Sequence, residues 1–247
     1  MASIGLNSQL SSIVNSPKQL IFPFQVDQKA SFRNFFCSPD NHQLIARLND
    51  LILSHNAYEV IINGDEGSGK SFLMQAVCNE LSSNDKKFAF IPMNKAISMG
   101  VEIFHNLASL DAVCIDDLQL ILSNGDWEKA LFNLINECQQ SGCSLILSMG
   151  NTKSSEIVAL LPDLLSRIKR MEFMTLHAVK NDHLQEALSF VAFQLDINIE
   201  KAELDFLINH QTRKFSLLVE NLISLDRQAA SLKRRITIPL IKETLEL

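Results

Sequence analysis

The chain has 247 residues, 47% of them apolar, so it is long enough for one sizeable core with a smaller lobe but too short for several independent domains. Its net charge of −6 and sequence pI of about 5.5 disfavour nucleic-acid binding through a broad basic face. Its five cysteines form no C-x-x-C pair, no apolar run is long enough for a membrane span, and residues 1–16 lack a secretory signal, so we expect an unprocessed cytoplasmic protein with no membrane contact.

Residues 1–30 are predicted to be a flexible tail, because residues 1–18 are rich in Ser and Asn with little hydrophobic pattern. The hexapeptide QLIFPF at residues 19–24 stands out within this tail. When extended, it places its three larger apolar side chains on one side, which fits either a pocketed groove on a partner or an edge strand folded back on the chain's own body. The residues that would contact a partner are Gln19, Leu20, Phe22, Pro23 and Phe24.

The middle of the chain alternates between apolar runs and stretches with helical spacing. The predicted strands are 59–63, 87–92, 111–116, 143–148 and 171–176. Helices are predicted over 41–54, 69–81, 96–108 and 126–140, the last capped by Asp126, and Pro162 is predicted to start a further short helix. This alternation predicts an α/β fold with a parallel sheet covered by helices on both faces.

The strand pattern stops near residue 180, and only amphipathic helices follow. They are predicted over 180–195, 200–209, 213–230 and 238–246, the last opened by Thr237 and Pro239. We therefore expect an α/β domain over residues 31–178 and a small all-helical lid domain over residues 179–247.

The most specific motif is GDEGSGKS at residues 64–71, which matches the phosphate-binding pattern G-x-x-x-x-G-K-S and directly follows a predicted strand. Its glycines, Gly64, Gly67 and Gly69, let the backbone curl so that successive N–H groups face an anion. Lys70 is expected to reach the β and γ phosphates of a nucleotide, and the Ser71 hydroxyl to bind Mg²⁺. The alternative is an ordinary glycine-rich turn between a strand and a helix.

Several polar residues are placed to complete a nucleotide site. Asp116 and Asp117 end the third predicted strand, where P-loop proteins place the acid that holds Mg²⁺ and the acid that orients the attacking water, although acidic residues also end strands at ordinary turns. Asn151 follows the fourth strand and would either polarise the γ phosphate or shape a turn. Asp65 and Glu66 lie inside the loop and would repel phosphates unless they point to solvent.

Two arginines have both a functional and a structural interpretation. Arg167, in LPDLLSR, is either a surface ion-pair residue or an arginine finger that enters the ATP site of a neighbouring subunit. Arg213, at the start of the third predicted lid helix, would reach back to the phosphates or lie at a solvated helix end. Phe32 and Phe35 either line the pocket for the base or pack the body of the protein.

Taken together, the loop GDEGSGKS, the strand DAVCIDDLQ, the helix GDWEKALFNLINE, the element LPDLLSRI and the ending ITIPLIKETLEL resemble the AAA+ family of the bacterial replication initiator DnaA. The resemblance covers about residues 30–247 and extends to the short DnaA-homologous regulators of the Hda type. It implies an AAA+ body with a lid. By that similarity, Lys70 and Ser71 carry over as phosphate and Mg²⁺ ligands, Asp116 and Asp117 as the acidic pair, Arg167 as the finger and Arg213 as the lid arginine. Asn151 departs from the family pattern, which often has an acidic residue there.

The hexapeptide at residues 19–24 likewise resembles the sliding-clamp-binding motif Q-L-x-L-x-L of this group, with phenylalanines in place of two leucines. The resemblance implies a regulator that binds ADP or ATP with Mg²⁺, docks on the DNA-loaded sliding clamp, and offers Arg167 to the ATP held by DnaA, which prevents re-initiation. DNA would be contacted mainly through the clamp complex. The sequence does not determine whether this protein hydrolyses its own nucleotide or whether it forms a homo-oligomer.

The sequence also allows three alternative functions. A DnaA-related adaptor or helicase loader shares the P-loop body and needs no clamp peptide, and a small-molecule P-loop kinase would need an acceptor site that the sequence does not show. The intact initiator is disfavoured because no helix-turn-helix region follows the lid helices.

Overall fold

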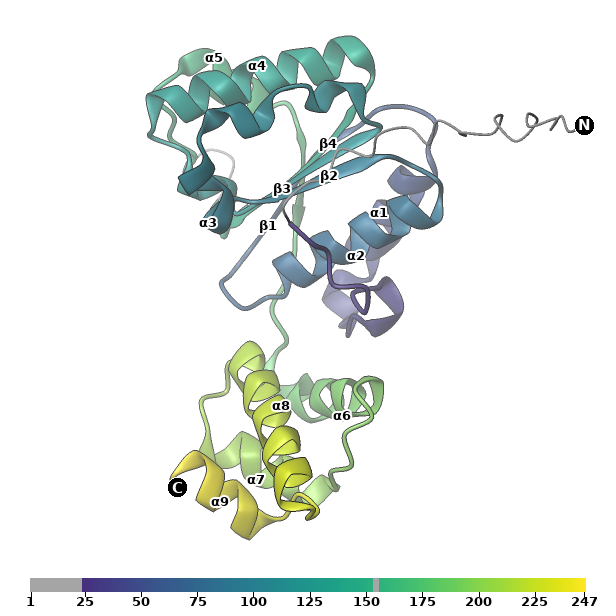
Figure 1. Ribbon diagram of the computed structural model, residues 1–247, viewed down its shortest axis with the longest axis vertical. Coiled ribbons are helices and arrows are strands. Elements are labelled where there is room, and N and C mark those ends of the chain that lie inside the picture. The colour runs from purple at the N-terminus through teal and green to yellow at the C-terminus, as the bar shows by residue number, and fades with distance from the viewer. Residues whose placement is uncertain (1–23, 153–155) are drawn as a thin grey trace, which may run out of the picture.

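A parallel sheet of five strands forms the centre of the body in the computed structural model, which describes residues 24–152 and 156–247 (Figure 1). The strands are β1 (Glu59–Gly64), β2 (Phe88–Pro92), β3 (Ala112–Asp116), β4 (Ser144–Gly150) and β5 (Glu172–Thr175). Their order in the sheet is β2-β3-β4-β1-β5, and each neighbouring pair is parallel. All five predicted strands are thus confirmed, with ends shifted by one or two residues.

Strands β1 to β4 are mostly apolar and buried because both faces of the sheet are covered by helices, whereas the edge strand β5 has exposed residues at its ends. Alternate residues of β1 point in opposite directions: Val60 and Ile62 join one core, and Ile61 joins the other. The first core is formed with α1 (His42–Leu53) and α2 (Lys70–Ser83). The second is formed with α3 (Met93–Ala96), α4 (Gly125–Ser141) and α5 (Pro162–Ile168), which lie on the opposite face (Figure 1).

The single helix predicted over 96–108 is wrong. The structure has short 3₁₀ turns instead, η3 (Ile97–Met99), η4 (Val101–Phe104) and η5 (Leu107–Ser109). Gly100 and Asn106 interrupt them with φ angles of 88° and 62°, in the left-handed region that a continuous helix excludes. The apolar residues that suggested a helix are still buried, since Phe104 and Leu107 enter the core beside α4.

The cap predicted for α4 is also wrong. The helix begins at Gly125, and the side chain of Asn124 accepts hydrogen bonds from the backbone N–H groups of Asp126 and Trp127. Asp126 therefore lies in the first turn, where its negative charge interacts favourably with the positive end of the helix dipole.

The C-terminal helices α6 to α9 form the lid (Figure 1), and their apolar side chains form a separate core. These helices are α6 (Leu184–Gln194), α7 (Lys201–His210), α8 (Phe215–Leu232) and α9 (Ile238–Leu245). Thr237 caps α9 as predicted, since its side chain accepts from the N–H of Leu240 at 3.5 Å, whereas α8 begins two residues later than predicted. Other 3₁₀ turns in the described residues are η1 (Phe32–Asn34), η2 (Pro39–Asn41), η6 (Leu118–Leu120) and η8 (Asn181–His183).

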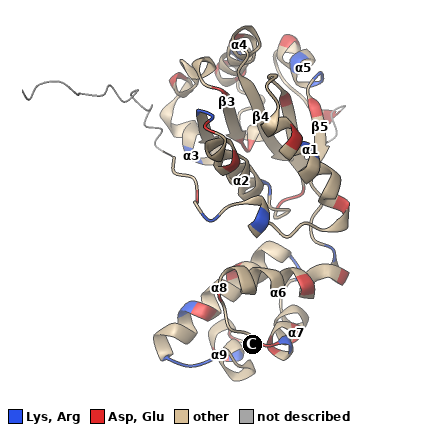
Figure 2. Cartoon of the chain, turned by 90° about the vertical axis from the view of Figure 1, so that its right-hand side faces the viewer, with Lys and Arg blue, Asp and Glu red and all other residues tan. Residues whose placement is uncertain are grey.

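The lid follows β5 through a connector that is bonded back to the body. Asn41 exchanges two hydrogen bonds of 2.9 Å with the backbone of His177, and Phe36 packs edge-to-face against Phe190 of α6 with ring centroids 5.8 Å apart. Charged residues of both signs are spread over the body and the lid (Figure 2). In the described part of the chain, we find no helix with the length and apolarity that a membrane crossing requires.

Candidate nucleotide-binding site

The loop between β1 and α2 lies at the carboxyl end of the sheet, where a parallel α/β sheet typically binds its ligand. Gly67 and Gly69 have φ angles of 78° and 96°, which favour glycine. A side chain at Gly69 would also lie 3.1 Å from the ring of Phe35, and one at Gly64 would collide with the carbonyl oxygen of Leu176. The three glycines of the motif are therefore required by backbone conformation or by space.

The polar groups of this loop converge on its interior. Lys70 is only 8% exposed, and its Nζ donates to the carbonyl oxygens of Gly64 and Asp65, both at 2.8 Å. Burial lowers the pKa of Lys70, while the surrounding carboxylates act in the opposite direction. The hydroxyl of Ser68 is buried and has no hydrogen-bond partner among the described residues. A buried cation beside an unsatisfied hydroxyl fits a bound polyphosphate.

The structure brings Asp116 and Ser71 together as predicted. Asp116 is 2% exposed at the end of β3, and its carboxylate accepts hydrogen bonds from the hydroxyls of Ser148 and Ser71. Burial raises the pKa of Asp116, and these two hydroxyl donors lower it in part. Asp117 follows with a φ of 62°, and its Oδ1 accepts from the side-chain amide of Gln119 at 2.9 Å.

Ser148 in β4 is a site residue that the sequence reasoning missed. Its hydroxyl donates to the carboxylate of Asp116 and accepts from the backbone N–H of Asp117 at 3.0 Å, so it fixes both acids. A signal was available, because Ser148 is a polar residue in the middle of the otherwise apolar run LILSM. Parallel pairing of β3 with β4 decides that the hydroxyl faces Asp116.

The two carboxylates inside the loop are exposed, and each has a partner. Oδ1 of Asp65 accepts from the side-chain amide of Asn151 at 2.7 Å. Oε1 of Glu66 pairs with Nζ of Lys214 in the lid at 3.0 Å, and this contact holds the pKa of Glu66 below its usual range. The sequence did not predict either partner, because Asn151 and Lys214 lie far from the loop along the chain.

The start of α8 lies against the phosphate-binding loop. A side chain at Gly67 would lie 2.7 Å from the hydroxyl of Ser216, so the lid closely covers this glycine. Arg213 precedes Lys214 in the connector to α8, and its side chain is exposed at this edge of the loop. The predicted lid arginine thus directly precedes a lysine that contacts the loop through Glu66.

Phe32 and Phe35 are partly buried and pack on the core shared by α1 and α2. The ring of Phe35 stacks on Phe72 with centroids 6.2 Å apart and lies beside Gly69. Both rings therefore contribute to the body at the edge of the loop, and a role in holding a base stays a prediction.

Arg167 lies at the opposite end of the sheet from the loop. It is on α5, and its Nη1 donates to Oε1 of Gln139 at 3.1 Å, while Nε2 of Gln139 donates to Glu59 at 3.2 Å. Glu59 is the first residue of β1 and Gly64 is the last, so the two ends are separated by roughly 16 Å at about 3.3 Å per residue. The structure does not bring Arg167 to the nucleotide site of its own chain.

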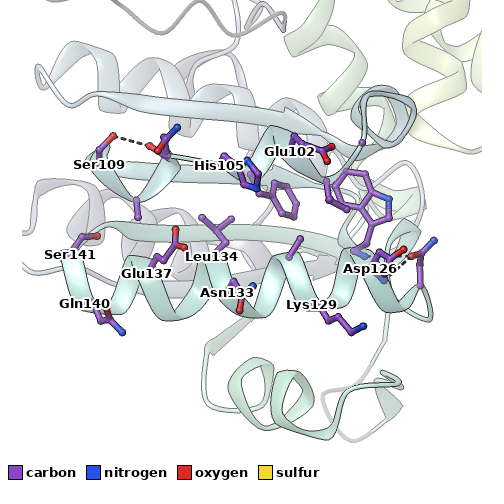
Figure 3. A pocket seen from close by; sticks show the side chains of 18 residues that line it. Glu102, His105, Ser109, Asp126, Lys129, Asn133, Leu134, Glu137, Gln140 and Ser141 are labelled. Atoms are coloured by element: carbon purple, nitrogen blue, oxygen red, sulfur yellow. Dashed lines mark hydrogen bonds between the residues drawn. The ribbon is translucent and has the colours of Figure 1, made fainter.

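A cavity of about 1180 Å³ lies away from the loop, between α4 and the segment 100–109. Figure 3 shows Glu102 and His105 on one side and Asn133, Leu134 and Glu137 of α4 on the other. No residue of the phosphate-binding loop lines this cavity. It is therefore separate from the candidate nucleotide site.

Comparison with known families gives two matches that together span most of the chain. A model described as the bacterial DnaA ATPase domain matches residues 26–173, and one described as the Hda lid domain matches residues 181–245. A protein of Haemophilus influenzae described as uncharacterized is 32% identical over 233 residues, which covers 93% of this chain and 99% of the relative.

Solved structures share the fold at low sequence identity. Domain III of the Thermotoga maritima replication initiation protein DnaA superposes with a TM-score of 0.77 at 17% identity, covering 90% of this chain and 98% of that domain. AMPPCP-bound DnaA from Aquifex aeolicus superposes with a TM-score of 0.65 at 17% identity, and the match covers 85% of this chain and 69% of the DnaA chain. The RuvB branch migration motor of Thermotoga maritima superposes with a TM-score of 0.64 at 18% identity, and the match covers 89% of this chain and 73% of the RuvB chain. The fold is thus an AAA+ body followed by a helical lid.

Proposed function

This chain belongs to the family of bacterial DnaA ATPase domains and carries an Hda-type lid, and from that premise we propose that it inactivates the replication initiator DnaA. The protein would hold an adenine nucleotide, attach to the DNA-loaded sliding clamp and stimulate hydrolysis of the ATP bound to DnaA. Re-initiation would then be prevented once a clamp has been loaded.

The resident nucleotide would be ADP or ATP with Mg²⁺. The support is a loop with glycines in left-handed conformations, which contains the buried Lys70 ammonium and a Ser68 hydroxyl that has no partner among the described residues. Ser71 and Asp116, which share a hydrogen bond, would hold Mg²⁺ by the hydroxyl and through water, and the metal would neutralise phosphate charge. Asp117 would orient a water molecule, and Asn151 would contact the γ phosphate from across the loop.

The observation that carries the regulatory proposal is the location of Arg167. Its guanidinium is bonded to Gln139 beside the amino end of β1, while the chain's own phosphate-binding loop is at the carboxyl end. A cation at this position would act on a triphosphate held by another molecule. In such a site an arginine neutralises the charge that develops on the transferred phosphoryl group and raises hydrolysis by about 10³- to 10⁵-fold.

Attachment to the clamp, the β subunit of DNA polymerase III, would use the hexapeptide at residues 19–24. Residues 19–23 lie outside the described part of the structure. Phe24 is described, and its side chain is partly buried against the cores on both faces of the sheet. Clamp binding would therefore depend on Gln19 and Leu20 and would require Phe24 to leave its contact. Tethering on the clamp would raise the effective concentration of two weakly attracted AAA+ surfaces.

The test is a reconstituted assay that follows DnaA-bound ATP with and without clamp-loaded DNA. Arg167→Ala should retain nucleotide and clamp binding and lose stimulation by about 10²-fold or more, because the transition-state charge is no longer neutralised. Arg170→Ala is the matched control, since Arg170 is an exposed arginine one turn further on. Full stimulation by Arg167→Ala would remove the finger assignment and the proposed function with it.

The same assay separates the regulator from a DnaA-related adaptor or helicase loader. Gln19→Ala and Leu20→Ala should lose both binding to purified clamp and clamp-dependent stimulation. Equal clamp binding by wild type and both variants would favour the loader, which needs no such peptide.

A further inference from the structure

The contact between Arg167 and Gln139 is a feature that the proposed function leaves unexplained. We propose that Gln139 is a positioning residue, which holds the Arg167 guanidinium in the orientation needed to enter the partner's triphosphate site. This inference rests on the proposed function and deepens it.

The chemistry of an amide suits this task. A guanidinium has five N–H donors and no acceptor, and Oε1 of Gln139 accepts one of them at 3.1 Å. Because the amide is neutral, it orients the group and leaves its positive charge available to an incoming phosphate. A carboxylate in the same place would form an ion pair and cancel much of that charge.

Gln139 is itself held in one orientation by its two neighbours. Its Nε2 donates to Oε2 of Glu59 at 3.2 Å, and a carboxylate can only accept, whereas the guanidinium can only donate. The amide nitrogen must therefore face Glu59 and the amide oxygen must face Arg167. The other carboxylate oxygen of Glu59 is buried and has no hydrogen-bond partner among the described residues, so this carboxylate is not shared with another donor there.

The backbone that carries Arg167 is fixed by the same helix. Glu128 of α4 is fully buried, and its carboxylate accepts from the N–H groups of Leu160 and Leu161 at 3.0 and 2.7 Å, directly before α5 begins. Hydrogen bonds to a buried carboxylate are among the stronger ones. Thus α4 holds α5 at its start through Glu128 and holds the side chain near its end through Gln139.

The test compares Gln139→Leu with Gln140→Leu in the assay of DnaA-bound ATP with clamp-loaded DNA. Leucine keeps the helix and removes the hydrogen bonds, and Gln140 is the next residue of α4, exposed on the surface that lines the cavity. For Gln139→Leu we expect a maximal stimulated rate about tenfold lower, as for the loss of one orienting hydrogen bond. The concentration that gives half-maximal stimulation should not change, since Gln139 acts through Arg167 and not on partner affinity. Gln140→Leu should match wild type in both quantities.

Two further variants test whether Gln139 acts through Arg167. Gln139→Glu should also lower the maximal rate, because its carboxylate would pair with Arg167 and lie against Glu59. In the Arg167→Ala background, Gln139→Leu should cause no additional loss, as expected for residues that act as a unit.

The outcomes distinguish this inference from the function on which it rests. An unchanged or raised maximal rate in Gln139→Leu, with stimulation still lost in Arg167→Ala, overturns the positioning role and leaves the proposed function intact. A further loss in the double variant also overturns it, because Gln139 would then act independently of Arg167. Full stimulation by Arg167→Ala overturns the proposed function first.

Discussion

The two ends of the parallel sheet are built differently. At the carboxyl end, Lys70, Asp116 and Ser148 are buried, and their hydrogen bonds are made within the chain. At the amino end, Arg167 is only partly buried and is bonded to a neutral amide. The first end carries the residues of the phosphate-binding motif, whereas the second carries an arginine bonded to an exposed amide. The two cations thus differ in burial: Lys70 is only 8% exposed inside its own chain, whereas Arg167 is accessible from outside.

The largest expected effect at the carboxyl end is that of Lys70→Ala. Removal of the buried ammonium should weaken binding of ATP and ADP by about 100-fold or more, because the phosphate charges would lose their closest cation in a partly desolvated loop. Titration with each nucleotide measures the change, and Lys95→Ala, at an exposed lysine of α3, is the control. An unchanged affinity in Lys70→Ala would remove the contrast between the two ends.

An intermediate effect is expected for Asp116→Asn, which should raise the stability of the fold and reduce its function. Burial raises the pKa of Asp116 above that of the unfolded chain, so the unfolded state loses this proton more readily and the buried charge costs stability at neutral pH. The variant should therefore resist denaturant better than wild type at neutral pH, while the effect of Mg²⁺ on nucleotide binding is lost.

The stability difference should shrink as the pH falls through the raised pKa and vanish below the ordinary Asp pKa of about 3.9. Denaturant titrations from pH 8 to pH 4 measure this trend. Asp117→Asn is the control for stability, because Asp117 is less buried than Asp116. Lower stability of Asp116→Asn at neutral pH would mean that the two serine hydroxyls stabilise the charge more than burial destabilises it.

The smallest effect is expected for Lys214→Met at the edge of the loop. The ion pair between Lys214 and Glu66 is exposed, and such pairs contribute little and are screened by salt. Nucleotide affinity should change by a few-fold at most, and less at high ionic strength. Glu66→Gln should have a similar effect, and the double variant should add nothing. A large, salt-independent loss in Lys214→Met alone would show that Lys214 contacts the nucleotide itself.

The sequence alone was sufficient for the features that depend on local pattern. Five apolar runs predicted five strands because a sheet covered on both faces buries the side chains on both sides of its strands. The loop GDEGSGKS was recognisable because its conformation needs glycines at fixed spacing, and Gly67 and Gly69 do have left-handed φ angles. The helix predicted over 96–108 is wrong because Gly100 and Asn106 have left-handed φ angles, although Phe104 is still buried in the core beside α4.

Only the tertiary structure decided which distant residues meet. The parallel pairing of β3 with β4 places Ser148 beside Asp116, and packing of the lid on the loop pairs Lys214 with Glu66. The packing of α5 on α4 sets Arg167 against Gln139 at the end of the sheet remote from the loop. Local patterns determine secondary structure because they act over one or two turns, whereas these contacts join residues 28 to 148 positions apart and arise only when the layers pack.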